Sequence, residues 1–137
     1  MKVLMMSLFS ATLAITSCAA TSPDASPEDV FAEQNNVQQM TSRRLATVLD
    51  GNTLIWDDGS AVYYSGSEIR TPNSDGTVTV GTIDFSNNMH CRTWNGGGEK
   101  CSSVYEDDDV NLNFFVEGQP DSSGGRGRIT IGKPEGL

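Results

Sequence analysis

The chain has 137 residues, with 9 basic and 18 acidic side chains and a net charge of −9. Such an acidic protein lacks the excess of positive charge that attracts phosphate backbones or anionic lipid headgroups. Nucleic-acid binding is therefore excluded. Beyond its N-terminal segment the chain is long enough for one domain with a modest core and too short for two.

The N-terminal segment has one basic residue, Lys2, followed by an apolar run from Val3 to Ile15. A bilayer-spanning helix needs about 20 apolar residues, so this run predicts a cleaved signal. It ends in Ile15-Thr16-Ser17-Cys18, which resembles the lipobox of bacterial lipoprotein precursors. The resemblance implies removal of residues 1–17 and acylation of Cys18.

A secreted protein cleaved after Ala20 is the alternative, with Cys18-Ala19-Ala20 as a small-residue cleavage site. On the lipoprotein hypothesis the protein is held in the bacterial envelope by its lipid. Ala19 stands where some lipoproteins carry the Asp that retains them in the inner membrane, so the resemblance implies the outer membrane, facing the periplasm. Residues 18–26 are small and polar, as expected of a lipidated tether.

Three cysteines in an exported chain leave one over, and acylation of Cys18 leaves the pair Cys91 and Cys101. An Asn-Gly-Gly turn between them predicts a hairpin that sets Cys91 opposite Cys101, with a disulfide that stabilises the fold by roughly 2–3 kcal/mol. Metal ligation by the pair is the alternative, but it lacks a second Cys or His pair at a useful spacing. The lone His90 would point to the opposite face of the strand from Cys91, which disfavours a Cys/His nucleophile.

Residues 27–137 are expected to form a single domain, helical over 27–50. Ser26 as N-cap and Pro27 at the first helical position predict a helix to about Gln34. A second apolar set follows 3.6-residue spacing and ends at Gly51. Its members are Val37, Met40, Leu45, Val48 and Leu49.

From residue 52 to 132 the apolar period changes to two, with turn residues between short runs. About eight strands follow, which predicts an α+β, mainly β fold: a helical segment, then an antiparallel meander with one disulfide hairpin. The meander can close into a small barrel or remain a curved sheet covered by a helix. The expected strands are 53–56, 61–65, 68–71, 77–85, the two arms of the cysteine hairpin, 110–116 and 128–131.

Residues 45–137 are similar in their order of features to small exported bacterial domains of unknown function. The shared features are Leu49-Asp50-Gly51-Asn52-Thr53, Cys91-x-x-Trp94, Cys101-x-x-Val104-Tyr105 and Gly132-Lys133-Pro134. The resemblance implies export and a compact β domain held by a disulfide. It implies no particular binding or catalytic activity.

Five aromatic residues are candidates for a ligand or partner surface. Adjacent Tyr63 and Tyr64 must face opposite ways in a strand, so one of them is expected outside or at an interface. Core packing is the usual role of strand aromatics and is the main alternative. The candidates are Trp56, Tyr63, Tyr64, Trp94 and Tyr105.

Two polar segments imitate ligand-binding loops. Asp107 to Asn113 alternates oxygen ligands, but Leu112 stands where a calcium loop needs Gly and Gly118 where it needs Glu, so an acidic turn is predicted. Its strand is expected to turn Val110, Leu112 and Phe114 inward. Gly124 to Arg128 resembles an anion-binding loop but lacks a strand-to-helix setting, so a mobile surface loop is predicted.

The sequence carries no His-Glu-x-x-His or Gly-x-Ser-x-Gly motif and one histidine, and its acidic pairs coincide with turns. We therefore expect no enzyme, no catalytic residues, no metal and no cofactor. The first functional hypothesis is a lipid-anchored envelope module that contacts another envelope protein. The second is a calycin-like barrel that binds an apolar or aromatic ligand in a cavity lined by Trp56, Trp94 and Tyr105.

Overall fold

The computed structural model of the protein describes residues 25–118 and 123–137. The expected signal peptide over 1–17, the acylation site Cys18 and the tether as far as residue 24 lie outside the described residues. Neither helix in the described part is long and apolar enough to cross a membrane.

Two short helices precede the strands. Helix α1 spans Pro27–Asn35, and the Ser26 hydroxyl caps it by accepting from the Asp29 backbone N–H at 3.4 Å, as predicted. Helix α2 spans Ser42–Leu49, and the Thr41 hydroxyl accepts from the Arg44 N–H at 3.2 Å. Both caps satisfy a donor that would otherwise lack a partner in the first turn of the helix.

The second helix, predicted from an apolar set that starts at Val37, begins only at Ser42. Residues 37–41 are not helical, because the Met40 N–H donates to the Val104 carbonyl at 2.7 Å and Gln39 forms an antiparallel bridge with Tyr105. These contacts lie where β6 runs on beyond its pairing with β5. The long-range backbone bonds therefore override the helical spacing of the apolar residues.

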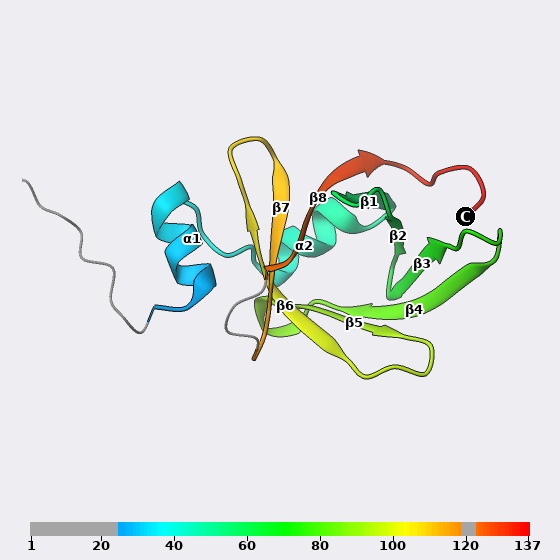
Figure 1. Ribbon diagram of the computed structural model, residues 1–137, viewed down its shortest axis with the longest axis horizontal. Coiled ribbons are helices and arrows are strands. Elements are labelled where there is room, and N and C mark those ends of the chain that lie inside the picture. The colour runs from blue at the N-terminus through cyan, green and yellow to red at the C-terminus, as the bar shows by residue number, and fades with distance from the viewer. Residues whose placement is uncertain (1–24, 119–122) are drawn as a thin grey trace, which may run out of the picture.

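Eight strands form a closed antiparallel barrel in simple meander order, and β1 pairs with β8 to complete it (Figure 1). The structure thus decides between the barrel and the open sheet. The strands are β1 Asn52–Trp56, β2 Ala61–Ser65, β3 Glu68–Pro72, β4 Val78–Asp84, β5 His90–Trp94, β6 Lys100–Glu106, β7 Asn111–Val116 and β8 Ser123–Ile131, with a 3₁₀ turn η1 at Ser86–Asn88.

Alternate residues of each strand fill the barrel. Leu54, Ile69 and Phe114 point inward and are completely or almost completely buried. Helix α2 adds Leu45 and Leu49 to this core and contacts β1 and η1, so it covers the end of the barrel where β1 begins. Because consecutive strands are antiparallel, the opposite end contains the β1–β2 turn and the start of β8.

Helix α1 lies outside the barrel, at one end of the part of the chain that the structure describes (Figure 1). The Phe31 ring lies 6.1 Å from that of Tyr105 and 5.3 Å from that of Phe115, centroid to centroid. Tyr105 and Phe115 belong to β6 and β7 and are almost fully buried, although they face away from the barrel interior. Helix α1 therefore covers an outer apolar patch on these strands.

The disulfide between Cys91 and Cys101 is present, and the two residues are directly opposed in the β5–β6 register, as predicted. The prediction of a mobile surface loop over Gly124 to Arg128 is wrong, because these residues pair with β1 and β7. Gly124 to Gly127 belong to β8, and a Cβ on Gly127 would lie 2.9 Å from the Ile55 carbonyl oxygen. Glycine is required there because β1 and β8 approach closely where they close the barrel.

Candidate functional site

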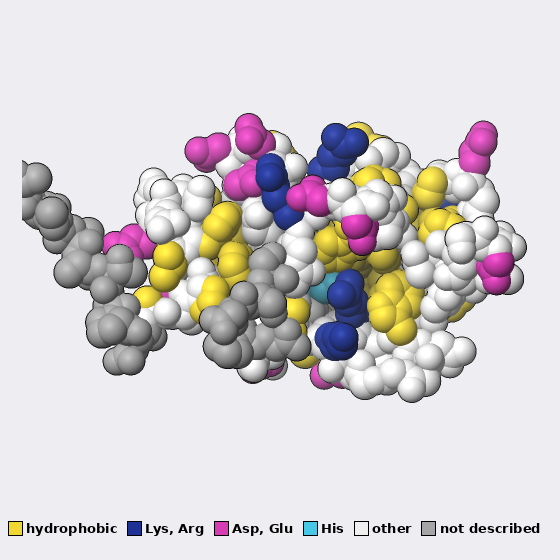
Figure 2. Space-filling view, viewed as in Figure 1, with side chains coloured by type: hydrophobic (Ala, Val, Ile, Leu, Met, Phe, Trp, Pro, Cys, Tyr) yellow, Lys and Arg dark blue, Asp and Glu magenta, His cyan; other side chains and the backbone are white. Residues whose placement is uncertain are grey.

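The open end of the barrel, opposite α2, has a hollow of about 520 Å³. We call it the mouth. Figure 2 shows apolar side chains around a central hollow, with basic and acidic side chains beside them. The mouth is lined from three places: the end of β1 with the β1–β2 turn, the middle of β5 and the start of β8. Its residues are Trp56, Asp57, Asp58, Ser60, Arg92, Gly124, Gly125 and Arg126.

Arg92 is an inward-facing arginine that we did not predict as a functional residue. It pairs with Ile83 on β4, whose side chain is in the core, and it alternates along β5 with the outward Cys91. Its guanidinium carbon lies 5.4 Å from the centroid of the Trp56 ring, within cation–π distance. Among the described residues its side chain makes no ion pair and no hydrogen bond.

Trp56 is held from beneath by the core and from the side by β8. Its ring centroid lies 4.7 Å from that of Phe114. A Cβ on Gly125 would lie 3.1 Å from the Trp56 ring, and one on Gly124 would lie 2.9 Å from a Val116 methyl carbon. Gly125 thus lets the β8 backbone pass close to the indole, which fixes the ring beneath Arg92, and Gly124 lets the same strand pass close to β7.

Two other charged side chains at the mouth, Arg126 and Asp58, are engaged by their neighbours. Arg126 pairs with Asp107 at 3.6 Å. The Asp58 carboxylate accepts from the Ser60 hydroxyl at 2.6 Å and from its backbone N–H at 2.8 Å, and these bonds hold the Asp58 pKa below its usual value. Arg92 therefore differs from Arg126, because no carboxylate of the described residues forms an ion pair with it.

Below the mouth a polar pair is enclosed in the core. The Tyr64 hydroxyl and His90 Nε2 lie 2.9 Å apart, and both residues are 1% exposed. Burial, and secondarily the charge of Arg92, lowers the His90 pKa to about 3, so the imidazole is neutral. Burial also raises the Tyr64 pKa. Neither group can reach a substrate, so the pair is structural.

The five aromatic candidates do not form one surface. Trp94 lines a second hollow of about 510 Å³ with Gly81, while Trp56 lines the mouth. Tyr64 lies in the core, and Tyr105 packs beneath α1, where it lines a separate hollow of about 320 Å³. Tyr63 faces outward and is partly exposed, as the alternation along β2 predicts. The expected cavity lined jointly by Trp56, Trp94 and Tyr105 is therefore not formed.

The acidic segment is a turn between β6 and β7. The Asp107 carboxylate accepts from the backbone N–H groups of Asp109 at 3.1 Å and Asn111 at 2.9 Å, so its oxygens hold the turn itself. Val110 was predicted to point inward, but it is 60% exposed with a φ of 63°, because it belongs to this turn. Leu112 and Phe114 are inward and buried, as predicted.

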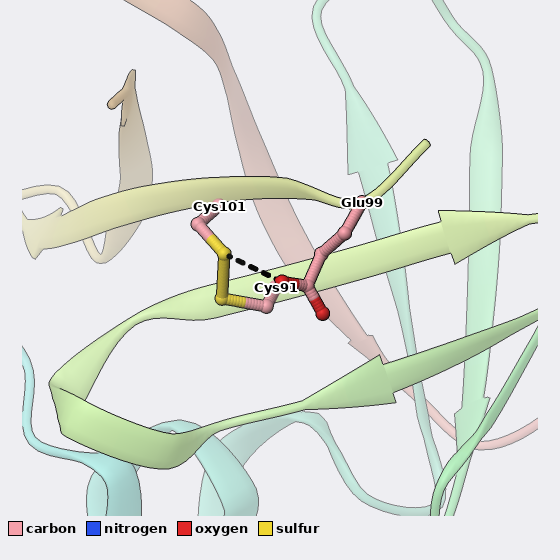
Figure 3. Close-up of side chains that lie close together, drawn as sticks. All are labelled: Cys91, Glu99 and Cys101. Carbon is pink, nitrogen blue, oxygen red and sulfur yellow. Dashed lines mark hydrogen bonds between the residues drawn. A yellow bond between two sulfur atoms is a disulfide. The ribbon is translucent and has the colours of Figure 1, made fainter. Parts of the chain in front are cut away.

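One group of possible metal ligands gathers beside the disulfide. Atoms of Cys91, Glu99 and Cys101 lie within 4.8 Å of one another (Figure 3). A metal prefers the deprotonated thiolate, and both sulfurs here are consumed by the disulfide. This group cannot hold a metal in the oxidised protein.

The fold and the mouth together define a small meander barrel with a packed interior and two arginines at its mouth, of which Arg126 pairs with Asp107 and Arg92 does not pair with a carboxylate of the described residues. Comparison with protein-family models, curated proteins and solved structures gave no match for the chain.

Proposed function

We propose that the protein is a lipid-anchored module of the bacterial cell envelope that contacts another envelope protein and catalyses no reaction itself. The observation that carries this proposal is the lipobox-like Ile15-Thr16-Ser17-Cys18 at the end of a signal-like segment. A disulfide-tied barrel is consistent with it, since structural disulfides persist in oxidising compartments such as the periplasm.

The barrel's chemistry agrees with a binding role. The one histidine of the chain is enclosed in the core and neutral, so it is unsuited to general base catalysis. The two cysteines of the described part are bonded to each other, so neither is a nucleophile. What remains for function is the surface of the barrel and its mouth.

We place the partner contact on the outer face of β2 to β4. Tyr63 is opposite Arg70, which in turn is opposite Val80, so the three form one row across the outer face. Val80 is 43% exposed and Val78, on the same face of β4, is 38% exposed. Branched apolar side chains beside an aromatic ring offer the partner contact area that loses little entropy on binding.

Crosslinking on intact cells tests this proposal. A photo-reactive residue at Val80 should give one discrete adduct with an envelope protein. The same residue at Arg128, which faces outward on β8 across the barrel, should give none. Cys18→Ala should abolish both the membrane fraction and the adduct. Equal labelling from Val80 and Arg128, or none from either, would remove the partner face from the proposal.

The second hypothesis, a barrel that binds an apolar or aromatic ligand, is supported by one observation, the hollow beside Trp56. Because the core is packed, such a ligand would bind at a surface hollow, and the mouth is the one that Trp56 lines. Tryptophan fluorescence titrated with fatty acids and small aromatics tests it. Saturable quenching is the expected result, and unchanged fluorescence with every compound would reject it.

A further inference from the structure

We infer that the mouth of the barrel is a binding site for a small organic carboxylate, which the guanidinium of Arg92 recognises. This site is separate from the outer face of β2 to β4 and does not depend on acylation of Cys18. It also differs in ligand chemistry from an apolar site, because a charged group would be the main recognition element.

The first argument is the missing partner of Arg92. A guanidinium has five N–H donors, and a partly buried cation without hydrogen-bond acceptors is unfavourable. Three other arginines of the described part each pair with a carboxylate: Arg44 with Glu106, Arg70 with Glu68 and Arg126 with Asp107. Arg92 has only the Trp56 ring. An anionic ligand would supply the acceptors that the described residues do not.

The second argument is preorganisation. The indole of Trp56 lies 5.4 Å below the guanidinium carbon and is itself fixed by Phe114 and by the β8 backbone at Gly125. A guanidinium stacked on a ring loses little further freedom when it binds, and its planar fork matches the two oxygens of a carboxylate. Arg92 is thus held before a ligand arrives, as a recognition group should be.

The third argument concerns the size and charge of the ligand. A hollow of about 520 Å³ falls within the range of small-molecule sites, and its Trp56 wall suits an apolar or aromatic body. Asp57 and Asp58 lie on the same hollow, and the chain carries −9 overall. These negative charges oppose a dianion such as a phosphate monoester more than a single carboxylate. The structure therefore favours a monocarboxylate.

Heteronuclear NMR of the full protein as isolated tests the site, with acetate, benzoate and decanoate as probes and benzamide as the neutral match of benzoate. At least one carboxylate should shift the Trp56 indole N–H and the Arg92 Nε–H saturably, and benzamide should not. Phenyl phosphate should bind more weakly than benzoate. The proposal is overturned if no carboxylate shifts these signals, or if benzamide shifts them as benzoate does, which would indicate an apolar site.

Variants assign the effect to Arg92. Arg92→Gln should weaken carboxylate binding at least about tenfold, because it removes a charge-assisted hydrogen-bonded pair. Arg92→Lys keeps the positive charge but loses the paired N–H donors of the guanidinium, so its carboxylate affinity should be intermediate. If Arg92→Gln does not fold, Arg92→Lys is the variant that tests the proposal. Arg43→Gln, an exposed position on α2 at the other end of the barrel, is the control and should bind as the unmodified protein does. Unchanged binding by both Arg92 variants would overturn the proposal.

Discussion

Tyr64 and His90 share a hydrogen bond of 2.9 Å inside the barrel, between strands that are not neighbours in the sheet. Each residue is 1% exposed, so water cannot replace the bond. A buried polar pair is tolerated when each member satisfies the other. The pair therefore links β2 to β5 across the core, and its state depends on keeping His90 neutral.

Stability should fall as the pH drops below about 6.5, the ordinary pKa of histidine. In the unfolded chain His90 takes up a proton near that pH, whereas in the folded protein its pKa is lowered to about 3 by burial and by Arg92. The unfolded state thus binds more protons between these values, and the free energy of unfolding falls by about 1.4 kcal/mol per pH unit. Urea unfolding from pH 7 to pH 4.5 measures this slope.

His90→Gln is the control, because glutamine does not titrate but can still hydrogen-bond to Tyr64. His90 is the single histidine of the chain, so most of the slope between pH 6.5 and 4.5 should disappear in this variant. The lowered pKa values of Asp58, Asp75 and Asp84 act at more acidic pH and should be retained. A wild-type slope in His90→Gln would show that another group causes it.

Replacing both Cys91 and Cys101 by serine should lower the melting temperature by roughly 10 °C, since the bridge contributes about 2–3 kcal/mol. Differential scanning calorimetry measures the change. Reductant should lower the melting temperature of the unmodified protein by a similar amount and leave the double variant unaffected. If the double variant melts like the oxidised protein, the bridge does not contribute as the loop-closure argument requires.

Local patterns were enough to predict the meander and the cysteine hairpin. The two-residue period fixes which face each side chain occupies, and the Asn-Gly-Gly turn centres the hairpin so that Cys91 meets Cys101. The same alternation places Arg92 on the face of His90, opposite to Cys91. That signal could have identified Arg92 as inward-facing, but the sequence alone does not show that it lacks a carboxylate partner.

Barrel closure and the 37–41 segment could not be predicted, because both depend on partners distant in the chain. Closure depends on the pairing of β1 with β8, which glycines such as Gly127 allow. Glycine is rare in strands, so the local sequence around Gly127 predicts a loop. Met40 has helical spacing from Val37, three residues earlier, yet its N–H bonds to Val104. In both cases a long-range backbone contact outweighs local propensity.

Gly81→Ala should destabilise the barrel by about 1–3 kcal/mol. An added Cβ would lie 2.6 Å from the Thr93 carbonyl oxygen and 2.8 Å from the Trp94 ring, so the backbone of β5 would have to move. Gly98→Ala is the matched control, since no atom lies within 4 Å of its added Cβ and its φ is not left-handed. Chemical denaturation of both variants should show a loss for Gly81→Ala alone. Equal stability of the two would mean that β4 and β5 yield more readily than their spacing indicates.

Ser26, the last residue of the predicted tether, caps α1 with its hydroxyl. Deleting residues 19–24 should leave the melting temperature unchanged, since no periodic segment lies there. Ser26→Ala should instead loosen α1 locally, at a cost of about 1 kcal/mol. Hydrogen exchange of the Val30 amide, which donates to the Ser26 carbonyl at 3.0 Å, separates the two changes. Exchange should accelerate in Ser26→Ala and stay the same in the deletion. A melting shift in the deletion as large as that of the cysteine variant would contradict a tether role for these residues.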